Sequence, residues 1–117
     1  MTHTDRVATM TAADRRAELE AELPLIVERL VRLGASKIVL FGTLARGEVG
    51  PTSDIDVLVV LDRPGRFADR LSAVYDAMQA RVGVDALVLT PAELDELAQT
   101  RPFIHDILAT GRVLHAS

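Results

Sequence analysis

Three short apolar segments, separated by helical patterns, constrain the fold more than any other feature of this chain. Segments 37–41, 54–60 and 84–89 are rich in Val, Ile and Leu and are bounded by glycine, proline or aspartate, which is typical of buried strands. A shorter candidate strand, 112–115, follows Gly111. Strands that alternate with helices predict an α/β or α+β fold, in which a small mixed sheet has helices on at least one face.

The expected helices begin and end at recognisable residues. Thr11 and Asp14 form a capping-box pattern, and the apolar spacing that follows predicts a helix that ends at Gly34. Pro24 lies within this pattern and is expected to bend or restart the helix. Further helices are expected at 67–78, from residue 90 onward, and around 103–110.

Composition narrows the class of protein. A length of 117 residues with 49% hydrophobic and 26% charged residues predicts one globular domain that spans 1–117. The net charge of -4 and the scarcity of aromatic residues argue against a nucleic-acid partner. The absence of cysteine excludes disulfides and thiolate metal sites. The polar segment 1–10 and the lack of a stretch of about 18 apolar residues give no export or membrane signal, so a cytoplasmic location is expected.

An Asp-x-Asp pair opens the second predicted strand. Because strand side chains alternate, Asp54 and Asp56 point to the same face with Cα atoms about 6.6 Å apart. Two neighbouring carboxylates repel each other unless a cation lies between them, so the pair predicts a divalent metal site. The alternative is that one aspartate caps the loop while the other faces solvent, which is the usual outcome for an isolated Asp-x-Asp.

A glycine-led loop precedes the aspartates and predicts a phosphate site. Gly42 lets the backbone approach a ligand, Thr43 adds a hydroxyl donor, and backbone N–H groups at a helix start attract anions. Arg46 is expected to supply a cation near the phosphates or to position the loop. Ser53 is either a turn residue or a further phosphate contact. Taken alone, the loop also fits an ordinary turn with Arg46 in solvent.

Together these motifs resemble a known family. The runs 42–47 (GTLARG) and 53–57 (SDIDV) are similar to the Gly-Ser-x-Ala-Arg-Gly and Ser-Asp-x-Asp signature of the DNA polymerase β-like nucleotidyltransferases, in particular the minimal nucleotidyltransferase branch. The resemblance runs from about Leu33 to the C-terminus and implies the polymerase β-like nucleotidyltransferase fold. Thr43 replaces the usual Ser; the hydroxyl remains, but the added methyl crowds the turn.

The resemblance also implies an activity. The family carries a third carboxylate on a neighbouring strand, and Asp85 is the matching position. We expect Asp85 to be buried in an apolar strand and relieved by a shared metal, the alternative being an edge-strand aspartate that faces water. The implied reaction transfers a nucleoside monophosphate, AMP from ATP, with two Mg²⁺ ions held by Asp54, Asp56 and Asp85. Asp85 could also accept the proton of the acceptor hydroxyl.

The histidines do not suggest a metal site. His3, His105 and His115 do not form a ligand cluster by their spacing.

The expected partner also follows from the resemblance. Minimal nucleotidyltransferases of this kind resemble the antitoxin halves of two-gene systems whose other half is an all-helical HEPN ribonuclease, which implies AMP transfer to a hydroxyl of that protein. Two alternatives are a catalytically weak nucleotide-binding module and a small-molecule, aminoglycoside-type nucleotidyltransferase. The last is disfavoured because the chain carries no second domain to enclose a small acceptor. The sequence leaves open whether the chain forms a homo-oligomer.

Overall fold

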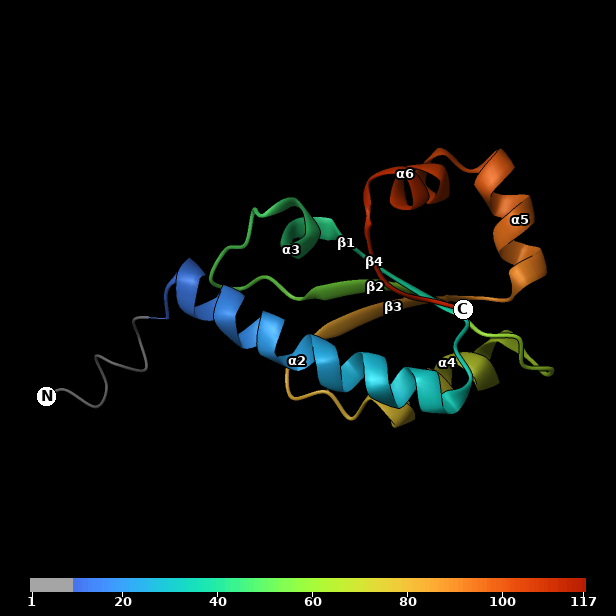
Figure 1. Ribbon diagram of the computed structural model, residues 1–117, viewed down its shortest axis with the longest axis horizontal. Coiled ribbons are helices and arrows are strands. Elements are labelled where there is room, and N and C mark those ends of the chain that lie inside the picture. The colour runs from blue at the N-terminus through green and yellow to red at the C-terminus, as the bar shows by residue number, and fades with distance from the viewer. Residues whose placement is uncertain (1–9) are drawn as a thin grey trace, which may run out of the picture.

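A four-stranded mixed sheet with helices on both faces forms the structure, a computed structural model that describes residues 10–117 (Figure 1). The elements follow one another as α2 (Ala12–Leu33), β1 (Lys37–Phe41), α3 (Gly42–Arg46), β2 (Ile55–Val60), α4 (Phe67–Met78), β3 (Val84–Leu89), α5 (Pro91–Thr100), α6 (Pro102–Thr110) and β4 (Arg112–Ala116). The predicted fold class is confirmed. The expectations for segment 1–9, including His3, lie outside the described residues.

The strand order is β3-β2-β1-β4, and only β2 and β3 run parallel. Helix α4 makes the crossover between these two strands. Helices α2 and α4 cover one face of the sheet, where Leu19, Ile26 and Leu30 pack against strand residues such as Leu40 and Val57. Helices α5 and α6 cover the other face (Figure 1).

The helix starts that depend on local capping match the sequence prediction. Thr11 and Asp14 form a reciprocal capping box, and Thr90 and Glu93 form a second one. Gly34 ends α2 in the left-handed conformation, with φ 117°. The expected restart at Pro24 is wrong, because α2 runs through Pro24 as one helix of 22 residues. Burial of Leu19, Leu23, Ile26 and Leu30 on the sheet holds both halves in register.

No helix within residues 10–117 combines the length and the apolar character that a membrane crossing needs.

Candidate active site

Asp56 and Asp85 lie on the sheet face that carries α5 and α6. In the strand register Asp56 of β2 lies opposite Phe41 of β1 on one side and Asp85 of β3 on the other. Gly42 follows Phe41 directly and begins α3. Asp56 and the buried residue Leu58 are two positions apart on β2, so their side chains lie on the same face of the sheet. The structure therefore brings the glycine loop, Asp56 and Asp85 together on adjacent strands.

Gly42 provides the space in which the Asp56 carboxylate lies. A Cβ atom at Gly42 would stand 2.1 Å from Asp56 Oδ2, closer than any real contact, and the Gly42 φ of 77° belongs to the left-handed region. Two independent constraints thus require glycine at this position, one from the backbone and one from the neighbouring carboxylate.

Several effects raise the pKa of Asp56 above its ordinary value. Burial is the largest cause, followed by the negative charges of Asp85 and Asp54, while the positive charge of Arg46 acts in the opposite direction. Each raising cause penalises the ionised form. A carboxylate in this setting gains from any cation that approaches it.

The Asp54 carboxylate lies against Gly83, ahead of β3. A Cβ at Gly83 would stand 2.5 Å from Asp54 Oδ1, so the Asp54 carboxylate leans over the residue that precedes β3. The Asp56 carboxylate leans toward Gly42, on the β1 side. The two carboxylates therefore lie beside opposite neighbours of β2: Asp54 beside Gly83, ahead of β3, and Asp56 beside Gly42, after β1.

Arg15 of α2 holds Asp54 in this orientation. Its Nη2 donates to Asp54 Oδ1 at 2.9 Å and its Nε donates to the carbonyl oxygen of Ser53 at 2.7 Å, while Nη1 pairs with Glu18. The Arg15 side chain is only 16% exposed, whereas that of Asp54 is 48% exposed. A guanidinium group therefore supplies the positive charge beside Asp54.

The carboxylates meet the requirements of a divalent cation in part. Asp56 and Asp85 face each other across paired strands and offer the oxygen donors that Mg²⁺ prefers. Over the described range 10–117, however, no group of three His, Asp or Glu side chains is placed to hold a metal ion. Arg15 engages one oxygen of Asp54, Oδ1, and so competes with a cation for that oxygen. The shared three-carboxylate site thus stays a prediction.

Asp85 lies on the strand next to β2, as expected, but its side chain is not buried. We expected a buried charge within an apolar strand, and this is wrong: Asp85 is exposed. The reason is that β3 is an edge strand of the sheet, and Asp85 is only its second residue. Asp85 nevertheless lies opposite Asp56 and contributes to the raised pKa of Asp56.

The residues predicted to bind phosphate lie in α3 and in the loop between α3 and β2. Thr43 is half-buried in the first turn of α3, which has no side-chain cap, in contrast to the capped starts of α2 and α5. Arg46 is largely exposed and its Nε donates to Glu48 at 2.8 Å. The Ser53 hydroxyl accepts from the Gly50 N–H at 2.8 Å and so closes the loop. Their roles toward a nucleotide stay predictions.

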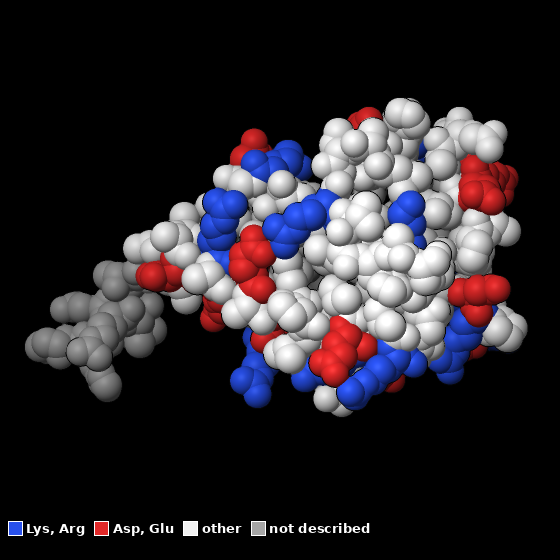
Figure 2. All heavy atoms as spheres, viewed as in Figure 1, with Lys and Arg blue, Asp and Glu red and all other residues white. Residues whose placement is uncertain are grey.

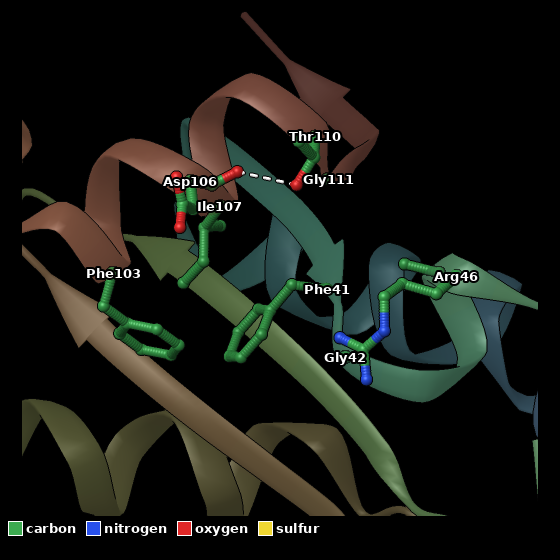
Figure 3. Close-up of a pocket in the computed structure, with 9 residues that line it drawn as sticks. Phe41, Gly42, Arg46, Phe103, Asp106, Ile107, Thr110 and Gly111 are labelled. Carbon is green, nitrogen blue, oxygen red and sulfur yellow. Dashed lines mark hydrogen bonds between the residues drawn. The ribbon is translucent and has the colours of Figure 1, made fainter. Parts of the chain in front are cut away.

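A pocket of about 410 Å³ adjoins the glycine loop (Figure 3). It lies between α3 and α6, and its lining includes Gly42, Arg46 and the α6 residue Phe103. Sequence reasoning missed both Phe103 and Arg15. Neither has a local signal: Arg15 meets Asp54 across 39 residues of chain, and Phe103 reads as an ordinary core position of an amphipathic helix.

The site thus combines a glycine loop at the end of β1 with an aspartate on β2 and another on β3, in an α/β domain. The sequence profile of the nucleotidyltransferase domain family matches residues 21–113, and the chain belongs to this family. A solved structure from Sulfolobus solfataricus, of a protein provisionally assigned as a nucleotidyltransferase, is 31% identical with a TM-score of 0.54. That match covers 68% of this chain and 77% of the other. No curated protein matches the chain.

Proposed function

We propose that the chain transfers a nucleoside monophosphate, AMP from ATP, to a hydroxyl group of a partner protein. The observation that carries the proposal is the contact between Gly42 and Asp56. It sets a loop with uncapped N–H groups directly beside a carboxylate whose pKa is raised and which faces Asp85. Family membership supports nucleotidyl transfer as the general reaction.

In the proposed reaction the acceptor hydroxyl oxygen attacks the α-phosphorus of the nucleotide in line with the leaving group. The new O–P bond forms as the bond from the α-phosphorus to the bridging oxygen breaks, and pyrophosphate leaves. The backbone N–H groups from Gly42 onward, with the Thr43 hydroxyl, bind the β- and γ-phosphates. Asp85, which is exposed, accepts the proton of the acceptor.

Asp54, Asp56 and Asp85 are the residues proposed to hold two Mg²⁺ ions. A bound divalent cation supplies charge neutralisation at the α-phosphate and at the leaving oxygen. The raised pKa of Asp56 supports this assignment, because a cation relieves the repulsion from its acidic neighbours.

The surface supports a protein rather than a small molecule as the acceptor. The surface around α6 and the middle of the view is mostly uncharged, while acidic and basic side chains lie along the left, lower and right margins (Figure 2). Val113 on the edge strand β4 is 55% exposed. We propose that an all-helical HEPN-type protein docks here and that the chain neutralises it as an antitoxin does.

A second candidate is a nucleotide-binding antitoxin with little or no turnover. The Arg15–Asp54 ion pair favours this alternative, because Arg15 already engages one oxygen of a carboxylate that the reaction requires. In that case the chain would neutralise its partner by binding alone.

Co-expression with the product of the adjacent gene tests these proposals. Intact-mass spectrometry of the purified complex should show a partner that carries one or more added AMP masses. The same partner from cells with the Asp56→Asn variant should carry none. A complex without added mass would support the binding-only alternative, and a neighbour that neither binds nor gains mass would overturn the partner assignment.

A further inference from the structure

The pocket between α3 and α6 is large enough for a substrate group, and nothing in the proposed chemistry yet uses it. Its volume of about 410 Å³ lies within the range of small-molecule sites. Phe41 lines it from the end of β1, Gly42 and Arg46 line it from α3, and Phe103 and Asp106 line it from α6. In Figure 3 the two phenylalanine rings lie on the same side of the pocket, and Arg46 lies across from α6.

The aromatic pair leaves room for a third flat ring. The rings of Phe41 and Phe103 meet edge to face, with centroids 5.7 Å apart and an interplanar angle of 84°. An edge-to-face contact covers the face of only one ring, so further ring surface remains for stacking. Phe103 is also 58% exposed, the highest value among the large hydrophobic residues of the described chain. A planar ligand would cover this surface.

The pocket is continuous with the proposed phosphate loop. Gly42 and Arg46 line the pocket, and Gly42 is also the residue against which the Asp56 carboxylate lies. A nucleotide whose phosphates meet the loop can therefore place the rest of the molecule in this pocket. The inference thus rests on the proposed function.

The two charged lining residues place opposite charges on opposite walls of the pocket. Arg46 lies on the α3 wall and attracts phosphate, whereas Asp106 lies on the α6 wall and repels it. The Thr110 hydroxyl donates to the backbone carbonyl of Asp106 at 2.8 Å, within α6 itself. A carboxylate accepts hydrogen bonds, so Asp106 suits a base that carries an amino group.

We propose that the pocket between α3 and α6 is the nucleobase subsite, with Phe103 as its stacking platform. It takes an aminopurine that stacks against Phe103 and donates its amino group to Asp106, while the phosphates run toward Gly42. Phe103 thereby binds the base and takes no part in the transfer chemistry.

Calorimetric titration with two probes tests the subsite. ATP carries a base, whereas inorganic tripolyphosphate presents the phosphates alone. Phe103→Ala should weaken ATP binding by about five- to a hundredfold, the range that loss of one base stacking contact produces. Tripolyphosphate affinity should stay within about twofold of wild type, because the phosphate loop is untouched.

Phe67→Ala is the matched control, since Phe67 is a 50% exposed phenylalanine on α4, against the other face of the sheet. It should change neither affinity. If Phe103→Ala disturbs folding by circular dichroism, Phe103→Leu keeps apolar bulk without the flat ring and should still weaken ATP selectively.

Three results would overturn the subsite. If wild type binds both probes and the Phe103 variants bind ATP equally well, the subsite is wrong and the proposed function stands. If those variants keep ATP affinity but require more acceptor protein for transfer, the pocket belongs to the acceptor. If wild type binds neither probe, the proposed function fails together with the subsite.

Discussion

Replacement of Gly42 by alanine should damage the site through the Asp56 carboxylate rather than through the backbone alone. A Cβ atom at Gly42 would lie 2.1 Å from Asp56 Oδ2. The Asp56 side chain must therefore rotate out of its place, since the neighbouring strand and the start of α3 cannot separate without breaking the β1–β2 pairing.

Gly47 provides the comparison that isolates this effect. Its φ of 73° nearly equals the 77° of Gly42, but a Cβ there meets only Arg16 Nη2, at 3.7 Å. Alanine in the left-handed region costs about 1–2 kcal/mol, offset by about 0.4–1 kcal/mol from the stiffer unfolded chain, and both terms apply equally to the two positions. Displacing Asp56 into a poorer rotamer adds about 0.5–1.5 kcal/mol at Gly42 alone.

Denaturant unfolding of the two variants measures this difference. Gly42→Ala should lower the free energy of unfolding by about 0.5–1.5 kcal/mol more than Gly47→Ala does. Nucleotidyl transfer should fall by about a hundredfold in Gly42→Ala, the scale expected for a misplaced active-site group, and much less in Gly47→Ala. In an Asp56→Ala background the stability difference should shrink, because only the contact with the Asp56 Cβ atom, at 3.2 Å, remains. Equal losses of stability and activity in the two glycine variants would refute the reasoning.

Three further predictions follow from the contacts of the site. Thr43→Val should weaken ATP binding by about 1.5–3 kcal/mol, the value of a hydrogen bond to a charged group, and unchanged affinity in calorimetry would remove Thr43 from the phosphate site. Asp56→Asn should raise the free energy of unfolding at neutral pH. The pKa of Asp56 is higher in the folded than in the unfolded state, so its ionisation destabilises the native protein above the folded-state pKa. The gain in stability from the substitution should therefore shrink as the pH falls through that pKa. A pH-independent gain would show another cause. The Arg15→Gln variant should bind Mn²⁺ a few-fold more tightly than the Arg16→Gln variant, because it loses about 1 kcal/mol of ion pairing with Asp54. Arg16→Gln is the control, since it removes the same charge one residue away. Equal Mn²⁺ affinities of the two variants would mean that Arg15 does not compete for Asp54.

The parts of the fold that depend on local sequence were predictable. Strands 37–41 and 84–89 and both capping boxes were identified because their signals lie within a few residues of each other. These features need no knowledge of what packs against them.

The features that depend on distant contacts were not predictable from pattern alone. Asp85 lies in an apolar run, and only the strand order reveals that the run is an edge strand whose second residue faces water. The divergence of the Asp54 and Asp56 carboxylates depends on Gly83, Gly42 and an arginine from the first helix. These contacts join elements that are far apart in sequence, so no local signal marks them.

The central claim is that this chain transfers AMP through the site at Gly42, Asp56 and Asp85. The most direct test incubates the protein with Mg²⁺, the candidate partner protein and ATP that carries the label on either the α- or the γ-phosphate. The account predicts that the partner becomes labelled from α-labelled ATP but not from γ-labelled ATP, and that Asp56→Asn abolishes the labelling. Labelling from the γ-phosphate, or equal labelling by wild type and Asp56→Asn, would contradict it.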